Sequence, residues 1–327
     1  MGEKHKDNFT SCSMKNKSFL SIVALFVLLS CGNSMDISED DKGIELVILG
    51  TIQDAGSPQI GCNKKCCKDL LSRGSSERMV VSLGVIDHNT KQQYLFEATP
   101  DFPFQLHHLQ RISNHYDLPN GIFITHAHIG HYTGLMHLGK EAMSSKDVKV
   151  YVMSEMKKFL TQNGPWSQLV SNSNINLVSL EASKEILVNK SLSVTPFIVP
   201  HRDEYSETVG FKIKGKFKTA LFIPDIDKWD KWEQSIMEEI KKVDYAFIDG
   251  TFYSGEEIGH RNIAEIPHPF IEESMSLFKA LSKKDRNKIY FIHYNHTNPV
   301  LDLKNSACRE IEENGFHLAR KNDRFRL

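Results

Sequence analysis

Short apolar runs, rich in β-branched residues and separated by polar turns, recur along most of the chain. Runs of about four to eight such residues bounded by turn signals are typical of β-strands. The strands predicted on this basis lie at residues 44–49, 79–86, 93–96, 121–125, 148–153, 176–180, 192–199, 208–213, 219–223, 245–248 and 288–292. Strands therefore dominate the expected fold.

Between several of these runs, apolar positions recur with helical spacing instead. The predicted helices lie at residues 104–115, 134–142, 154–161, 226–242, 270–282 and 303–314. Neighbouring strands form hairpin-like pairs around His88-Asn89 and around residues 214–216, which argues against a purely parallel sheet. We therefore expect an α+β fold in which two mixed β-sheets are flanked by helices.

The first part of the chain has a different pattern, that of a targeting segment. An apolar run at residues 19–30 follows Lys15 and Lys17 and ends directly before Cys31. The run is too short to span a bilayer as a helix, and its flanks are those of a secretory signal. A buried core strand and an uncleaved anchor are the alternatives.

The residues Leu28-Leu29-Ser30-Cys31 resemble the lipobox of bacterial lipoproteins, whose cysteine becomes the lipidated first residue. The resemblance implies a lipoprotein-type signal peptide at 1–31, with Met14 as an alternative start, and a lipid anchor on Cys31. It places the protein at the bacterial cell envelope, facing the periplasm or the outer membrane. The polar residues 32–43 then form a tether, and residues 44–327 form one large domain.

Charge and composition narrow the function classes. The 327 residues include 40 Lys and Arg against 41 Asp and Glu, so the net charge of −1 gives no general attraction to nucleic acid. Six cysteines are too few for a disulfide scaffold in a chain of this length and enough for a metal site or a lipid anchor. The 15 histidines are the informative surplus.

Three of these histidines lie within six residues, directly after an apolar run. His126 and His128 are two residues apart and project to the same side of an extended chain, and the following turn can bring His131 to them. Imidazole nitrogens grouped in this way suit Zn, Fe, Mn or Ni, with an open position left for water. The stretch therefore predicts a metal centre at the end of a strand.

This stretch resembles the His-x-His-x-Asp-His motif of the metallo-β-lactamase superfamily. Three later stretches, each after a predicted strand, match the family's remaining ligands: Val199-Pro200-His201, Ile223-Pro224-Asp225 and Phe291-Ile292-His293. The resemblance implies an αββα four-layer sandwich. It also implies a first metal held by His126, His128 and His201, a second held by His131 and His293, and Asp225 bridging the two.

One position departs from the family's motif. The motif aspartate, which helps to bind the second metal and to position the attacking hydroxide, is Gly130 in this chain. A hydrogen atom cannot replace a carboxylate as a ligand. The second metal is therefore expected to be weak, absent or completed by another group.

Within the superfamily, three stretches resemble the coenzyme PQQ synthesis protein B family and the cyclic-phosphate phosphodiesterases of phosphonate metabolism. They are an N-terminal signature at residues 49–62, a strand end at 98–101 and a C-terminal signature at 292–299. The C-terminal signature is similar to that of the PQQ group almost throughout.

Cys62, Cys66 and Cys67 lie within six residues, which suggests a structural zinc completed by a histidine. The phosphodiesterase family uses three cysteines and the second histidine of a C-terminal His-x-x-His pair, which is His296 here. Because this chain has Cys-x3-Cys-Cys, the assignment of Cys66 and Cys67 stays open. A Cys62–Cys66 disulfide is the alternative. Cys308 is expected to be buried.

The resemblance also provides a general acid and a function. His268 resembles a loop histidine that related enzymes place near the substrate, where it could protonate a leaving oxygen; a surface histidine is the alternative. We expect a metal-dependent hydrolase that attacks a small, anionic phosphodiester or ester through a metal-bound hydroxide, with Asp225 and His268 as catalytic residues.

The expected cofactors are one structural zinc and one or two active-site zinc ions, with Fe or Mn as alternatives in the active site. Two other functions stay open because of Gly130. One is a PQQ-type biosynthetic protein that oxidises or carries an intermediate. The other is a binding protein that has lost its chemistry.

Overall fold

The computed structural model describes residues 43–70, 78–259 and 266–327. The expected signal peptide, with Met14 and Cys31, and nearly all of the expected tether lie outside the described residues. In the described part of the chain, no helix combines the length and the apolar character that crossing a membrane requires.

The first sheet that the described residues form has seven strands in the order β14-β1-β2-β3-β4-β5-β6. The pairs from β14 to β3 are antiparallel and the pairs from β3 to β6 are parallel. The strands are β1 (Ile44–Gly50), β2 (Ser82–Asp87), β3 (Gln92–Phe96), β4 (Gly121–Phe123), β5 (Val148–Val152), β6 (Ile175–Ser179) and β14 (Arg324–Arg326).

The second sheet, within the same described ranges, also has seven strands, in the order β13-β12-β11-β10-β9-β8-β7. It repeats the plan of the first, since the pairs from β7 to β10 are antiparallel and those from β10 to β13 are parallel. The strands are β7 (Ile186–Leu187), β8 (Ser193–Ile198), β9 (Val209–Lys214), β10 (Thr219–Ile223), β11 (Tyr245–Asp249), β12 (Ile289–Ile292) and β13 (His317–Leu318).

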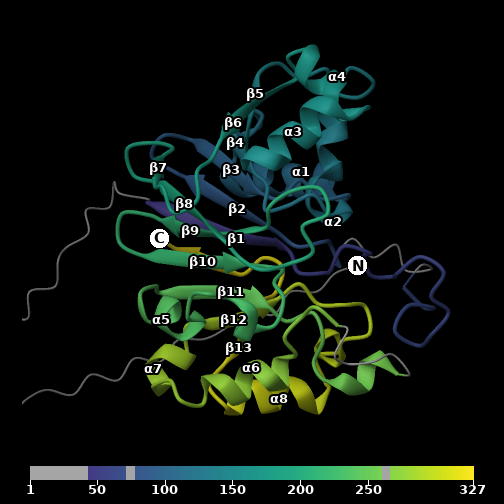
Figure 1. The fold of residues 1–327 in the computed structure, drawn as a ribbon, viewed down its shortest axis with the longest axis vertical. Helices are drawn as coiled ribbons and strands as arrows, with labels where there is room; N and C mark the ends of the chain where they lie inside the picture. The colour runs from purple at the N-terminus through teal and green to yellow at the C-terminus, as the bar shows by residue number, and fades with distance from the viewer. Residues whose placement is uncertain (1–42, 71–77, 260–265) are drawn as a thin grey trace, which may run out of the picture. The chain divides into compact units, whose positions relative to one another are not determined.

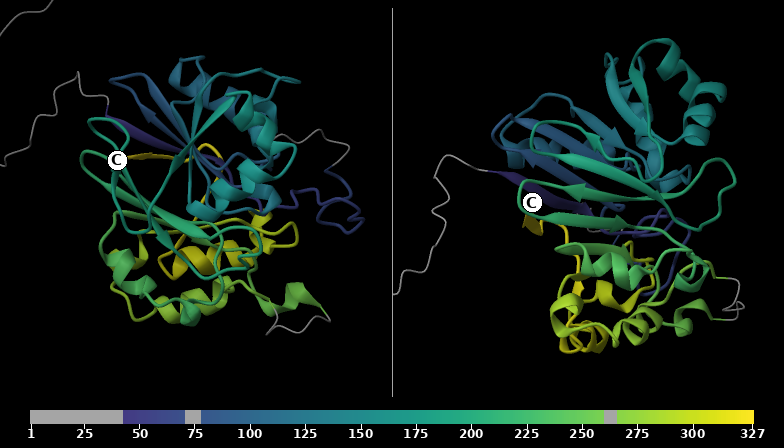
Figure 2. Two further views of the ribbon diagram at one scale, coloured as in Figure 1. Left: turned by 45° about the horizontal axis from the view of Figure 1, so that its top comes forward. Right: turned by 60° about the vertical axis from the view of Figure 1, so that its left-hand side comes forward.

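Helices cover the outer face of each sheet (Figures 1 and 2). On the first sheet lie α1 (Phe102–Ser113), α3 (Ser154–Gln162) and α4 (Trp166–Ser171), and the short α2 (Ile129–Tyr132) follows β4. The helices after β10 are α5 (Ile236–Lys241), α6 (Ile271–Phe278), α7 (Lys283–Arg286) and α8 (Ser306–Glu313). The predicted αββα sandwich of two mixed sheets is confirmed.

Two predicted helices differ in the structure. The predicted helix at 226–242 is a single 3-10 turn, Trp229–Lys231, followed by α5. The indole of Trp232, between the two, donates a hydrogen bond to the backbone oxygen of Ile198 and so holds the chain against β8. The predicted helix at 134–142 is a 3-10 helix, Thr133–Leu138.

Central strands are buried on both faces, which explains their unbroken apolar runs. In β10, Ala220 and Phe222 belong to the core between the sheets, while Leu221 and Ile223 pack with the helices of the second sheet. The core between the sheets contains an aromatic stack: the ring of Phe123 lies 4.7 Å from that of Phe96 and 4.4 Å from that of Tyr151.

We predict that Phe123→Ala lowers the free energy of unfolding by about 3–5 kcal/mol, because it leaves a cavity between two rings in a fully buried site. Urea denaturation of the metal-free protein measures this change. Phe104→Ala, at a side chain that is 64% exposed, is the control and should change the free energy of unfolding by less than about 1 kcal/mol. Equal effects of the two substitutions would contradict the packing argument.

Candidate metal centre

The six residues expected to bind the active-site metals all lie in segments that follow strands. His126, His128 and His131 follow β4, and His201 follows β8. Asp225 follows β10 and His293 follows β12. Because both sheets end at the same side of the sandwich, these loops meet there, and the structure brings all six predicted active-site ligands together.

The first group consists of His126, His128, His201 and Asp225, whose ligand atoms lie within 4.8 Å of one another. Asp225 Oδ2 is 3.5 Å from His126 Nε2 and 3.2 Å from His201 Nε2. Among the described residues, His126 Nε2, His128 Nδ1 and His201 Nε2 are buried without a hydrogen-bond partner. Buried polar atoms without partners are costly, so this group fits a metal ion.

The second group consists of Asp54, His131, Asp225 and His293, again with ligand atoms within 4.8 Å. Asp225 Oδ2 lies between the two groups, because it is also 3.9 Å from His131 Nε2 and 4.0 Å from His293 Nε2. This is the position that a bridging carboxylate requires. Asp54 was not among the predicted site residues.

Each of these histidines has a polar partner at its other ring nitrogen. His126 Nδ1 is 2.9 Å from Thr125 Oγ1, and His293 Nδ1 is 2.8 Å from Thr251 Oγ1. Carboxylates lie near the others: Glu204 is hydrogen-bonded to His128 Nε2 at 3.1 Å, whereas Glu97 Oε1, 3.3 Å from His131 Nδ1, and Asp227 Oδ1, 3.4 Å from His201 Nδ1, are at ion-pair distance without hydrogen-bond geometry. Such outer contacts orient metal-binding imidazoles and fix their tautomer.

The charges in this buried cluster are strongly coupled. Burial alone would raise the pKa of Asp225, but His201, His268 and His293 outweigh burial and hold that pKa well below its usual range. Burial likewise opposes the shift at Asp54, where His131 and His293 keep the pKa of the carboxyl low. Buried carboxylates of this kind need compensating positive charge, which a divalent cation can provide.

His268 joins the cluster from the loop before α6. Its Nδ1 is 2.9 Å from Asp249 Oδ2 and 3.2 Å from Asp225 Oδ1. Although burial lowers the pKa of His268, Asp249 and Asp225 together raise it to about 9. Asp249 is itself fixed by Thr251, whose backbone N–H and hydroxyl both donate to Asp249 Oδ1. His268 is therefore a buried histidine of the cluster and not a surface one.

Two residues at this site adopt positive φ values that are unusual for side chains other than glycine. They are Glu97, with φ 78°, at the end of β3, and His293, with φ 68°, at the end of β12. Such backbone conformations cost of order 1–3 kcal/mol and cluster at functional sites. These backbone conformations direct the side chains of Glu97 and His293 into the cluster.

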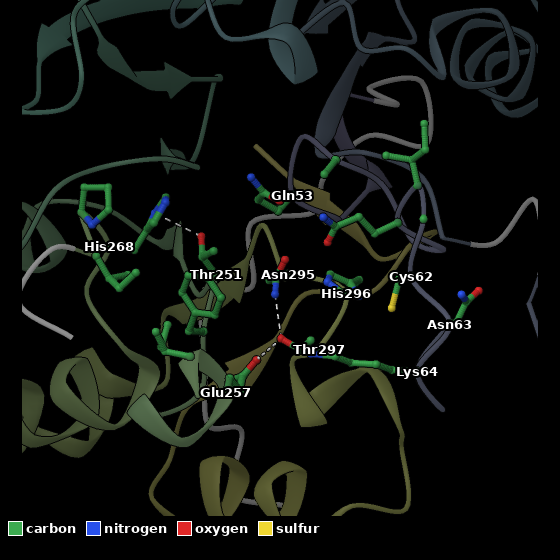
Figure 3. Close-up of a pocket in the computed structure, with 18 of the residues that line it drawn as sticks. Gln53, Cys62, Asn63, Lys64, Thr251, Glu257, His268, Asn295, His296 and Thr297 are labelled. Carbon is green, nitrogen blue, oxygen red and sulfur yellow. Dashed lines mark hydrogen bonds between the residues drawn. The ribbon is translucent and has the colours of Figure 1, made fainter. Parts of the chain in front are cut away.

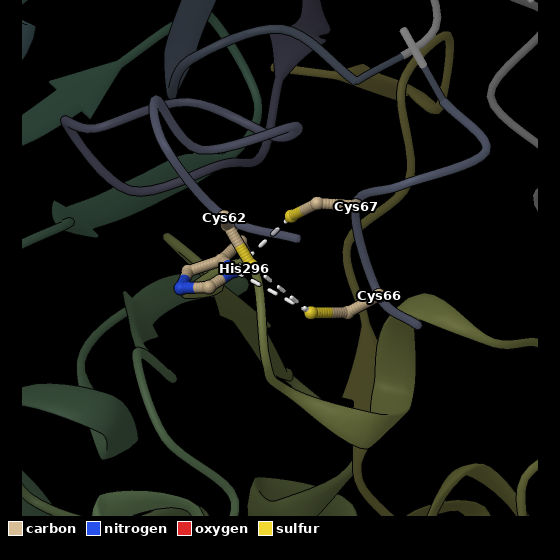
Figure 4. Close-up of side chains that lie close together, drawn as sticks. All are labelled: Cys62, Cys66, Cys67 and His296. Atoms are coloured by element: carbon tan, nitrogen blue, oxygen red, sulfur yellow. Dashed lines mark hydrogen bonds between the residues drawn. The ribbon is translucent and has the colours of Figure 1, made fainter. Parts of the chain in front are cut away.

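The predicted cysteine cluster also comes together. His296 Nδ1 lies 3.2 Å from Cys67 Sγ and 3.6 Å from Cys66 Sγ, and Cys62 Sγ is 3.8 Å from Cys66 Sγ (Figure 4). The last distance is too long for a disulfide, so the alternative Cys62–Cys66 bridge is not formed. All three sulfur atoms and His296 meet at one centre.

In the absence of a cation, the thiolate form of Cys66 is disfavoured in this cluster. Burial and the two neighbouring cysteines raise the pKa of Cys66 to about 12. A zinc ion would remove this penalty by binding the thiolates directly. The donor set of three cysteines and one histidine is one that structural zinc sites use.

A cavity of about 610 Å³ extends between the two clusters (Figure 3). Thr251 and His268 line it on the side of the histidine cluster, and Cys62 and His296 line it on the other side. The cations Arg202 and Lys64 also line it. The candidate metal centre thus adjoins a space large enough for a small molecule.

Comparisons with known proteins agree with this geometry. The family model described as the Beta-lactamase superfamily domain matches residues 92–294, more than half of the chain. The chain therefore belongs to the beta-lactamase superfamily.

Individual relatives share about a quarter of their aligned residues with this chain. Coenzyme PQQ synthesis protein B of Acinetobacter baylyi is 25% identical over 295 residues, which cover 81% of this chain and 95% of that protein. The protein of the same name from Pseudomonas putida is 26% identical over 302 residues, covering 83% and 96%.

Two solved structures share the fold. Zn(2+)-bound PqqB from Methylobacterium extorquens gives a TM-score of 0.72 at 20% identity and covers 86% of this chain and 100% of that one. A diphosphatase from the PhnP family gives 0.59 at 19% identity, covering 87% and 97%.

We predict that Cys67→Ser removes one zinc ion per chain and lowers the thermal midpoint by about 5–10 °C, because the loop loses its metal clamp. Elemental analysis and a thermal scan measure the two effects. Cys308→Ala is the control, since Cys308 is buried apart from the cluster and should keep the zinc content of the wild type. Unchanged zinc in Cys67→Ser would contradict the structural site.

Proposed function

We propose that this protein is a metal-dependent hydrolase of a small anionic phosphodiester or ester. The observation that carries the proposal is the pair of ligand groups that share Asp225 Oδ2 and adjoin a cavity lined by two cations. Zinc is the proposed metal, because imidazole, carboxylate and thiolate donors all suit it.

The bound metal would supply Lewis-acid chemistry and make a water nucleophile available at neutral pH. The protein's own residues provide the orientation. Asp225 is held by histidines of both ligand groups. Thr251 orients the ring of His293 by a hydrogen bond, and Glu97 and Asp227 place negative charge beside the rings of His131 and His201.

His268 is the proposed general acid. Asp249 and Asp225 engage its Nδ1, which leaves the Nε2 edge of the ring for a substrate in the cavity that His268 lines. The same two carboxylates stabilise the protonated ring. His268 can therefore hold a proton beside the leaving oxygen and donate it as the bond breaks.

The cavity favours an anionic substrate. Arg202 lies next to the ligand His201 in the sequence and lines the cavity together with Lys64. A guanidinium binds phosphate or carboxylate oxygens through paired, charge-assisted hydrogen bonds. Arg202 thus has the position to hold the charged group of a substrate beside the metal centre.

We predict that His268→Asn lowers kcat for bis(4-nitrophenyl) phosphate by about 10²- to 10⁴-fold, because the general acid is lost. Steady-state kinetics of the zinc-loaded full chain give the value. Elemental analysis serves as the control, since the zinc content should remain that of the wild type. A variant with full zinc and undiminished kcat would exclude His268 as the acid.

A second prediction concerns the charge of the substrate. Arg202→Ala should raise KM for the same phosphodiester by roughly 10- to 100-fold with little change in kcat, because one charge-assisted contact is lost. Arg202→Lys should restore part of the affinity, since it keeps the charge without the guanidinium fork. An uncharged nitrophenyl ester is the control substrate, and an equal effect on its KM would contradict anion recognition by Arg202.

A role in cofactor biosynthesis is the second candidate function. It is supported by the relatives named coenzyme PQQ synthesis protein B, which align over most of this chain. In this case the same cluster would hold the metal for oxidation or carriage of an intermediate. Zinc-loaded protein that hydrolyses neither phosphodiesters nor esters, while its purified native form contains iron, would favour this candidate over hydrolysis.

A further inference from the structure

The ligand motif lacks its usual carboxylate at Gly130, yet the space that a side chain would need there is filled. A Cβ atom on Gly130 would lie 2.5 Å from Asp54 Cα and 2.8 Å from Asp54 Cβ and Cγ. Carbon atoms in van der Waals contact lie about 3.5–4.0 Å apart. Asp54 and any side chain at position 130 therefore exclude each other.

The carboxylate of Asp54 contacts both histidines of the second ligand group. Its Oδ1 lies 3.0 Å from His131 Nε2 and 3.2 Å from His293 Nε2. A tetrahedral zinc site with bonds of about 2.0–2.1 Å has ligand-to-ligand edges of about 3.3 Å. The contacts of Asp54 with the two rings thus come close to the edges of such a site, and Asp225 Oδ2, at 3.9 and 4.0 Å from the same nitrogens, lies somewhat farther out.

The orientation of the two rings leaves these nitrogens for a shared partner. His131 Nδ1 faces Glu97, and His293 Nδ1 faces Thr251. Both Nε2 atoms therefore point to Asp54 Oδ1. Two neutral imidazoles and two carboxylates give a complete set of four protein ligands.

We propose that Asp54 supplies the carboxylate that Gly130 lacks, so that Asp54, His131, Asp225 and His293 form the second metal site. The ligand comes from the loop after β1 and enters the site from a different part of the chain than the histidine motif. Position 130 is glycine because the loop needs its space.

Backbone hydrogen bonds fix the position of this loop. Gln53 N donates to Tyr294 O at 2.9 Å, and Tyr294 N donates to Thr51 O at 2.7 Å. Gly56 N closes a turn by donating to Gln53 O. Asp54 is thus held within one turn that is attached directly to the residue after His293, and its carboxylate needs no other clamp.

The test uses the full chain, stripped of metal with a chelator and reloaded with zinc. Asp54→Ala and Asp54→Asn should each retain one zinc ion fewer than the wild type after loosely bound zinc is removed by dialysis. In calorimetric titrations with zinc, the corresponding site should bind at least 100-fold more weakly, since even an outer contact of a ligand changes affinity by about 10- to 100-fold. Asp117→Ala, at a side chain that is 82% exposed, is the matched control and should bind as the wild type does.

Substitutions at position 130 make the test specific. The double variant Asp54→Gly with Gly130→Asp should not regain the lost zinc ion, because the Cα atom that glycine keeps at position 54 lies 2.5 Å from a Cβ atom at position 130. Gly130→Asp alone should gain no zinc and should lower the thermal midpoint, because its side chain collides with Asp54. If Asp54→Ala fails to fold, Asp54→Asn decides the question, because it keeps the shape of the side chain.

Folded Asp54 variants that keep the zinc number and affinity of the wild type would overturn the proposal. So would a wild type that holds no second active-site zinc. The inference rests on the metal binding in the proposed function and not on hydrolysis. Wild-type protein that binds both metals but hydrolyses nothing would remove the proposed reaction and leave the role of Asp54 intact.

Discussion

The functional side of this protein depends on a short backbone junction between its two sheets. Residues 51–53, directly after β1 of the first sheet, pair with Tyr294, two residues after β12 of the second. Tyr294 is fully buried, and its hydroxyl donates a hydrogen bond to the backbone oxygen of Phe291 and lies 3.3 Å from that of Ala319. The buried ring thus holds Tyr294 in place, and the hydrogen bonds of its backbone hold the ends of the two sheets together.

Both clusters of candidate metal ligands, the histidine cluster and the cysteine cluster, are attached to this junction. Asp54 follows its first side and His293 precedes Tyr294, so two ligands of the histidine cluster are one residue away from it. His296 lies two residues beyond Tyr294, and Cys62 and Cys67 follow on the loop that starts at the junction. The same few hydrogen bonds therefore set the distance between the two clusters and the width of the cavity that separates them.

The sequence predicted the parts of this architecture that carry dense local patterns. Eleven predicted strands match observed ones because each contains a run of mainly apolar, buried residues, whereas β7, β13 and β14, with two or three residues each, are too short to carry such a pattern. The histidine motif and the cysteine cluster were visible because their residues are close together in the chain. Asp54 and Glu97 were not predicted, because a single acidic residue after a strand can have many roles. Only the three-dimensional structure shows which side chains it contacts at the ends of the sheets.

A metal ligand is defined by where its oxygen lies and not by its place in the chain. In this protein the backbone and the side chain of Asp54 fill the volume that a side chain at position 130 would need. The glycine in the motif would be a sign of lost chemistry if that volume were empty. Because Asp54 fills it and contacts His131 and His293 through one oxygen, the glycine is better explained as the space that an alternative ligand requires. One steric constraint then explains both the glycine at position 130 and the close approach of the Gln53-Asp54 loop to it.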